Sequence, residues 1–183
     1  APDGRQTYYS EECMSCDGSQ VIGAYECTTA DDMQKNILDQ FYRETEGNNW
    51  SFNNWDWETH ECNWNGIVCN TEDQIIEINL SSNNLVGNPG YKIFQLPKLQ
   101  SLDLSENNID FVFDGIADAK NLETLTLYGT NLDSLDDIEQ LSETSITELY
   151  LSANNLEGTI PDSIYTLFSL EILMISHNNN LSG

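Results

Sequence analysis

The sequence predicts an α/β repeat solenoid, in which short coils stack side by side behind a helical segment that covers the first coil. A motif recurs about every 24 residues from Ile75 onward, an amphipathic segment precedes it, and a stretch rich in Trp and Cys separates the two. The chain has 183 residues, of which 39% are hydrophobic, and this is enough to form a buried core. We expect a Cys-containing N-terminal extension (1–30), an N-terminal cap (31–74) and repeats (75–183) that stop in mid-repeat.

The repeat follows the frame apolar-x-x-apolar-x-apolar-x-x-Asn-x-apolar. Its alternating apolar side chains point into a core that one repeat cannot close, so neighbouring repeats must stack. The side-chain amide of the Asn can donate hydrogen bonds to, and accept them from, backbone groups of adjacent coils. In the third copy Thr130 stands in place of this Asn. We therefore expect the third coil to be the weakest or to recruit a water molecule. The copies begin 24, 23, 24 and 24 residues apart, at Ile75, Leu99, Leu122, Ile146 and Leu170.

This frame is identified as the leucine-rich repeat. The segment Leu156-Glu157-Gly158-Thr159-Ile160-Pro161 resembles the L-x-G-x-I-P continuation of the plant-specific class. The resemblance implies a curved parallel sheet of about five repeats that lines a concave face. The second and third copies lack the continuation, so we expect their convex sides to differ from the regular 3₁₀ backs of that class.

The segment before the repeats also resembles this family. Asp31-Asp32 offers an N-cap to an amphipathic helix, and Cys62-Asn63-Trp64-Asn65-Gly66-Ile67-Val68-Cys69 follows a Trp-rich loop. The combination is similar to the N-terminal cap of plant and algal leucine-rich-repeat proteins and implies a disulfide between Cys62 and Cys69. We expect the Trp cluster to cover the open end of the core, with a sugar-stacking platform as the alternative. The apolar face of the helix consists of Met33, Ile37, Leu38, Phe41 and Tyr42.

The five cysteines favour an oxidising compartment. Cys13-Met14-Ser15-Cys16 predicts a small disulfide knot; a zinc half-site or a redox pair are weaker alternatives, because His60 and His177 lie far away and no βαβ pattern surrounds the motif. Proximity pairs Cys27 with Cys13 or Cys16, which leaves one cysteine over. We expect a secreted protein or the ectodomain of a membrane protein, with an organelle lumen as a further option.

The charge is strongly negative, with 31 acidic residues against 6 basic ones and a net charge of −25. This balance excludes nucleic acid and anionic membranes as partners, and no apolar run is long enough to span a bilayer. Residues 121–183 contain acids but no Lys or Arg, so they attract cations or basic partners. A weak calcium site is conceivable within this acidic ridge, at Asp133, Asp136, Asp137 and Glu139.

Side chains between the buried strand positions point out of the concave face. In the later repeats these side chains are unusually apolar, which is typical of a binding surface, although they could also be merely tolerated there. Two acidic residues beside them supply hydrogen-bond acceptors. The candidate ligand-binding set is Tyr128, Tyr150, Ile172, Met174, His177, Glu123 and Glu148.

Enzyme motifs are absent from the sequence, and no cofactor is expected. We therefore predict a non-enzymatic extracellular recognition module that binds a protein, peptide or glycan on the concave face. The alternative is a structural matrix or cell-wall component with calcium-responsive acidic surfaces. The uncapped C-terminal end suggests continuation or self-association, and Asn49, Asn79 and Asn180 occupy N-glycosylation sequons.

Overall fold

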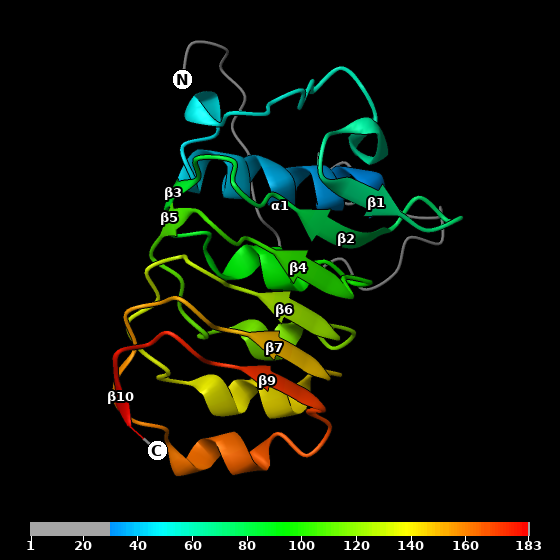
Figure 1. Cartoon of the computed structure of the whole chain (residues 1–183). Helices are drawn as coiled ribbons and strands as arrows, with labels where there is room; N and C mark the ends of the chain where they lie inside the picture. The colour runs from blue at the N-terminus through cyan, green and yellow to red at the C-terminus, as the bar shows by residue number, and fades with distance from the viewer. Residues whose placement is uncertain (1–29, 183) are drawn as a thin grey trace, which may run out of the picture.

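The computed structural model describes residues 30–182, and a six-stranded sheet runs the length of the coil stack (Figure 1). Its strands lie in the order β1-β2-β4-β6-β7-β9; β1 is antiparallel to β2, and the other neighbours are parallel. Each repeat thus contributes one strand in register with the next, as the sequence predicts. The strands are β1 (Ile67–Cys69), β2 (Ile75–Asn79), β4 (Ser101–Asp103), β6 (Thr124–Thr126), β7 (Glu148–Tyr150) and β9 (Ile172–Met174).

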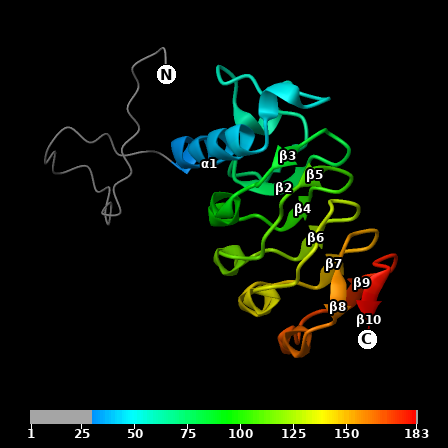
Figure 2. The ribbon, with the colours of Figure 1, turned by 90° about the vertical axis from the view of Figure 1, so that its left-hand side faces the viewer.

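The opposite, convex side carries a 3₁₀ helix in each of the first four coils (Figure 2). The second and third copies, for which we expected a departure from regular 3₁₀ backs, also carry 3₁₀ helices, η4 and η5. These two helices begin after a left-handed residue, Gly115 or Asp137, whereas η3 and η6 do not. The apolar residues of these segments supply the packing that the missing L-x-G-x-I-P continuation would otherwise provide. The convex helices are η3 (Tyr91–Gln95), η4 (Ile116–Asp118), η5 (Ile138–Glu143) and η6 (Asp162–Thr166).

Short strands join neighbouring coils along a second edge. Strands β3 (Val86–Gly87) and β5 (Asn108–Ile109) form one parallel pair, and β8 (Glu157–Thr159) and β10 (Asn180–Ser182) form another. Residues 131–133 of the third coil form no strand at this edge. This edge is therefore interrupted in the middle of the solenoid.

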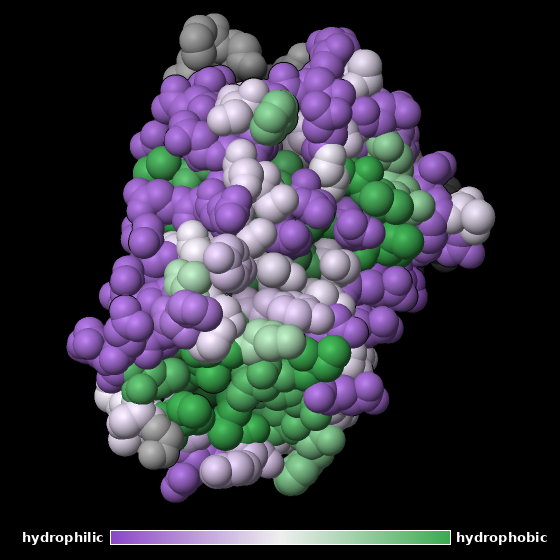
Figure 3. All heavy atoms as spheres, in the orientation of Figure 1, coloured by the Kyte–Doolittle hydropathy of each residue, from purple (hydrophilic) through white to green (hydrophobic). Residues whose placement is uncertain are grey.

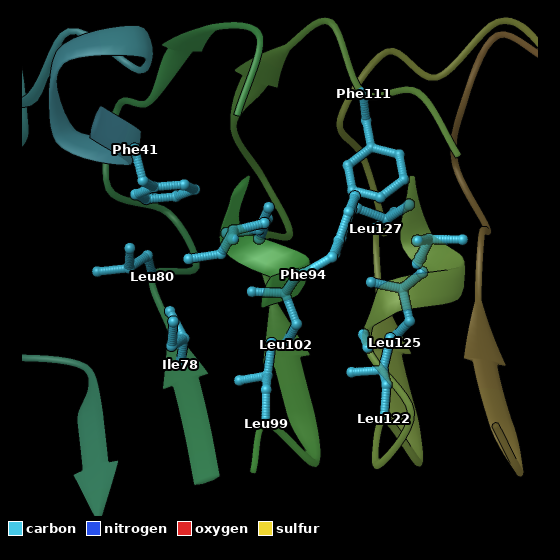
Figure 4. Packing of buried hydrophobic residues seen from close by; sticks show 14 of the residues in the cluster. Phe41, Ile78, Leu80, Phe94, Leu99, Leu102, Phe111, Leu122, Leu125 and Leu127 are labelled. Carbon is cyan, nitrogen blue, oxygen red and sulfur yellow. The ribbon is translucent and has the colours of Figure 1, made fainter. Parts of the chain in front are cut away.

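The hydrophobic core is a set of columns, each built from the same repeat position in successive coils (Figure 4). Ile78, Leu102 and Leu125 are fully buried and lie one above the next. At the N-terminal end, Phe41 of α1 (Ala30–Glu44) lies over this core. Burying a Leu side chain contributes about 1.5–3 kcal/mol, so the stacking of successive coils adds to the stability with every buried leucine.

An asparagine ladder runs beside the core. Asn107 is buried; its amide N–H₂ donates to the Leu80 and Leu104 carbonyl oxygens, and its Oδ1 accepts the N–H groups of Asn83 and Leu85. The amide therefore satisfies backbone groups of two coils at once.

In the third coil the ladder is incomplete. The Thr130 hydroxyl donates to the Leu127 carbonyl oxygen at 3.0 Å, within its own coil. Among the described hydrogen bonds, none joins Thr130 to the N–H groups of Asn107 and Ile109, which an amide oxygen at this position would accept. Whether the third coil is the weakest one stays a prediction.

The cap follows the expected plan with differences at its start. The helix α1 begins at Ala30, so Asp31 and Asp32 lie in its first turn and not at the N-cap. Met33 is 43% exposed, in contrast to its place on the predicted apolar face, while Ile37 and Leu38 are buried. Within residues 30–182, no helix is long and apolar enough to cross a membrane.

The cap loop is held by the predicted Cys62–Cys69 disulfide. Gly66, between these cysteines, has a φ of 80°, and a Cβ there would lie 2.2 Å from the Asn79 carbonyl oxygen. Only glycine tolerates both the left-handed backbone and this close approach. The predicted partners Cys13, Cys16 and Cys27 lie outside the described residues.

The tryptophan cluster covers the first coil. Trp50, Trp55 and Trp64 are 3–6% exposed, and each indole N–H donates to a carbonyl oxygen of the cap. Their rings contact one another and those of Phe41 and Tyr42. These three indoles therefore belong to the core of the cap.

Candidate functional site

The predicted ligand-binding patch lies on and after strands β6, β7 and β9. Tyr128 is 44% exposed and Met174 is 51% exposed, while Tyr150 and Ile172 are half-buried. Figure 3 shows hydrophobic residues gathered over the last coil, where β9 lies. An exposed apolar area of this kind on a folded domain is typical of a contact surface.

The strand register determines which side chains of the patch are neighbours. Tyr150 pairs with Met174 on β9, and Glu148 pairs with Ile172. Because adjacent strands lie about 4.8 Å apart, each pair forms a continuous strip across β7 and β9. An aromatic ring, a thioether and a carboxylate are thus presented together.

A hydrogen bond fixes the polar part of this patch. The Tyr150 hydroxyl donates to Glu148 Oε2 at 2.8 Å. This bond, together with partial burial and the negative charge of Glu148, raises the pKa of Tyr150 above its ordinary value of 10.0. The phenol is therefore neutral at physiological pH and holds the carboxylate in one orientation.

The rings of Tyr128 and Tyr150 do not lie side by side as one aromatic platform. Tyr150 aligns with Thr126, and Tyr128 follows two residues later, beyond the end of β6. In the described part of the chain, the two rings form no stacked or edge-to-face pair. Tyr128 therefore lies apart from Tyr150, beyond the end of β6.

The two predicted acceptors differ in position. Glu148 lies on β7 beside Tyr150, whereas Glu123 precedes β6 and is exposed. The Glu123 backbone carbonyl oxygen accepts the N–H groups of Thr147 and Glu148, so this residue also helps to hold the sheet. Glu148 is the better-placed acceptor for a ligand on the patch.

His177 lies at a backbone bend that the sequence pattern did not reveal. Its φ is 58°, and the equivalent residue of every other coil also has a positive φ between 52° and 63°. Only Gly129 at this position gives a sequence signal of left-handed backbone. His177 is exposed, and its Nδ1 lies 3.1 Å from Ser176 Oγ. The equivalent residues are Ser82, Glu106, Gly129 and Ala153.

Two serines between the strand and this bend are buried, although the alternation predicts that they face outward. Ser105 and Ser152 are 9% and 8% exposed. The Ser105 hydroxyl donates to Asp103, and the Ser152 hydroxyl accepts from Ser176. Tyr128, at the equivalent position of the third coil, is 44% exposed, so the low exposure of Ser105 and Ser152 reflects their short side chains and not an inward turn of the chain.

The four acidic residues of the predicted calcium site do not converge. Among residues 30–182, only His60, Cys62 and Asp73 bring three candidate metal-ligand atoms within 4.8 Å of one another. Cys62 is part of the disulfide, so it offers no thiolate. Asp133, Asp136, Asp137 and Glu139 are exposed and form part of an acidic surface, and calcium binding there stays a prediction.

The three sequon asparagines are exposed. Asn49 donates to Glu46 at 3.1 Å, and the Asn79 Oδ1 accepts from the Ser81 backbone and hydroxyl. Asn180 lies on β10. Glycosylation at these positions stays a prediction.

Comparisons with known proteins support the same repeat. Two leucine-rich-repeat family models match residues 74–132 and 145–167. Receptor-like protein 50 of Arabidopsis thaliana is 34% identical over 133 residues, which cover 70% of this chain and 12% of that protein. The chain thus spans about an eighth of that relative.

Solved structures show the same architecture. The BIR2 ectodomain from Arabidopsis thaliana matches with a TM-score of 0.69 at 23% identity. The match covers 82% of this chain and 82% of that one. A chain of the BIR3–SERK2 complex from the same organism has a TM-score of 0.64 at 28% identity, over 80% of this chain and 82% of that one.

Proposed function

Because the chain is a leucine-rich-repeat protein of the plant type, we propose that it is a non-enzymatic extracellular recognition module whose concave face binds a protein or peptide segment. The observation that carries the proposal is the patch on β7 and β9, where Tyr150, Met174 and Glu148 are presented on a preformed sheet. A rigid aromatic and apolar surface loses little conformational entropy on binding, and it is the kind of surface in which hot spots occur.

The charge of the chain favours a partner with both basic and apolar side chains. Glu148 lies within the patch, Glu171 precedes β9, and residues 121–182 contain no Lys or Arg to neutralise them. A Lys or Arg of the ligand would pair with these carboxylates, and its apolar neighbours would cover Tyr150 and Met174. An acidic segment would be repelled.

Two further observations support an extracellular recognition role. The Cys62–Cys69 disulfide is typical of an oxidising compartment. The BIR3–SERK2 structure is a complex of two proteins, so a chain of this architecture forms a protein–protein contact. Transfer of such a contact to this chain is part of the proposal.

The proposal is tested with an array of immobilised peptides of three types: cationic and apolar, neutral and apolar, and anionic and apolar. We expect the parent protein to bind the first type, with affinity that falls as the salt concentration rises. Tyr150→Ala combined with Met174→Ala should weaken binding about tenfold or more. Tyr165→Ala is a matched control, because Tyr165 is 78% exposed on the convex η6.

Equal binding of all three peptide types, or unchanged binding by the double variant, would overturn the concave-face proposal. Calcium-dependent self-association in light scattering would instead support the structural alternative. These outcomes are distinguishable, because the peptide array is read without calcium.

A further inference from the structure

A pocket of about 540 Å³ lies in the cap, away from the concave patch, and is lined by Asn53, Asn54, Trp55, Asp56, Thr59 and Asn63. We propose that this pocket binds an uncharged carbohydrate. It lies in the loop between α1 and β1, at the top of the molecule in Figure 1. The proposal does not depend on the peptide-binding function of the concave face.

The walls of the pocket are held rigidly by hydrogen bonds within the cap. Asn53 donates to the Tyr42 hydroxyl at 2.7 Å and to the Gly47 carbonyl oxygen at 3.0 Å. The Asp56 carbonyl oxygen accepts the Trp64 indole N–H at 3.1 Å, and Asp56 Oδ1 accepts the Glu58 N–H at 3.0 Å. Asn53 and Asp56 are therefore already in place before a ligand arrives, which lowers the entropic cost of binding.

Several polar groups of the pocket remain available to a ligand. Asn54 uses its Oδ1 to accept the Asn65 N–H, and its amide N–H₂ has no partner among the described residues. Asn63 is exposed, and neither end of its side-chain amide is bonded within residues 30–182. The second carboxylate oxygen of Asp56 is likewise unused by the described chain. Donors and acceptors thus occur side by side.

This mixture of groups matches the chemistry of a sugar ring. A sugar hydroxyl both donates and accepts, so it can bond a carboxylate and an amide together. Trp55 supplies an apolar lining, and Trp57 is 37% exposed at an edge-to-face contact with Trp55. Because Trp55 is only 5% exposed, the C–H face of a sugar would pack mainly against the exposed part of Trp57 beside it.

The charge around the pocket selects against acidic sugars. Residues 44–91 contain no Lys or Arg, and Asp56 and Glu58 are both exposed. Lys35 of α1 lies 5.9 Å from the centre of the Trp64 ring, and it is not among the lining residues. An anionic polysaccharide would therefore meet repulsion, and a neutral one would not.

The test measures binding of the whole chain to soluble hexasaccharides of β-1,4-linked glucose, xylose, mannose and N-acetylglucosamine, with oligogalacturonate as the anionic counterpart. Calorimetry and saturation-transfer NMR provide the affinity and the contacts. We expect at least one neutral oligosaccharide to bind, and oligogalacturonate not to bind. Tyr150→Ala should leave this binding unchanged, which separates the result from the concave-face proposal.

Two variants localise the site. Asn63→Ala removes an amide that has no bond within the described chain, and Asp56→Asn keeps the acceptor for the Glu58 N–H. Each should weaken binding about threefold to tenfold, as the loss of one hydrogen bond does. Asn179→Ala, an exposed asparagine of the last coil, is the matched control. Absence of binding by every neutral sugar at millimolar concentration, binding of oligogalacturonate alone, or equal affinity of both site variants and the parent would overturn the proposal.

Discussion

The interior coils and the last coil contain the same residue types at the same repeat positions but bury them differently. Leu125 and Leu149 are fully buried, whereas Leu173, their equivalent in the last coil, is only partly buried. Phe168, just before that coil, is 93% exposed. At the first coil, α1 and the tryptophan cluster provide the missing neighbour, and Ile78 is fully buried. Burial in this fold therefore depends on the adjacent layer more than on the residue itself.

The largest expected difference between the two regions concerns their leucines. Leu149→Ala should lower the free energy of unfolding by about 2–5 kcal/mol, because it leaves a cavity between two coils. Leu173→Ala should cost clearly less, because that side chain is already partly exposed. Urea denaturation followed by circular dichroism measures both values. Tyr150→Ala, on the outer face of the strand that carries Leu149, is the control and should change stability little.

An equal loss of unfolding free energy in Leu149→Ala and Leu173→Ala would contradict the expected difference between the interior coils and the last coil. It would mean that the last coil is supported as firmly as the interior, in contrast to the exposure of its side chains.

The next effect concerns the capped end. Replacing Cys62 and Cys69 by Ser should lower stability by about 2–3 kcal/mol, the range that loop-closure entropy gives for a short loop. Hydrogen exchange should show earlier opening of residues 61–79 than of β4 and β6, because the disulfide holds the cap loop against the first coil. Uniform loss of protection across all coils would show that the cap and the repeats unfold as one unit.

A smaller effect should distinguish the third coil from its neighbours. Thr130→Asn restores an amide whose oxygen can accept the N–H groups of Asn107 and Ile109, as Asn154 does for Thr130 and Leu132. The gain should be roughly 0.5–1.5 kcal/mol in urea denaturation. Asn107→Thr is the reverse substitution and should destabilise. If Thr130→Asn is neutral or destabilising, the interruption of the ladder is already compensated.

The sequence predicted the parts of the fold that follow from periodicity. The repeat spacing located β2, β4, β6, β7 and β9, and the cap motif located the Cys62–Cys69 disulfide. The sequence did not predict local backbone conformation or which neighbouring residues bury a given side chain. The positive φ at Glu106 and Ala153 has no residue-type signal, because any L-residue can be held there by surrounding hydrogen bonds.

The candidate site was predictable only in part. Alternation along the strands placed Tyr150 and Met174 on one face, and the register confirms that they are paired. The same alternation offset Tyr128 from Tyr150 by two residues, but it did not show that Tyr128 lies beyond the end of β6. The polar cap pocket could not be predicted, because its residues come together through a loop without a regular period.

The smallest expected effect concerns Tyr150, at the boundary between the interior coils and the last one. Glu148→Gln should lower the pKa of Tyr150 toward its ordinary value of 10.0, because it removes the charged acceptor and its repulsion of the phenolate. The raised pKa in the folded state means that stability linked to this phenol is constant below about pH 10 and is lost as the pH rises through the folded value. NMR titration of ¹³C-labelled tyrosine measures the pKa, with Tyr150→Phe to assign the signal. An unchanged pKa in Glu148→Gln would show that the hydrogen bond does not hold in solution, and Glu148 would then be free to turn toward a basic ligand on its own.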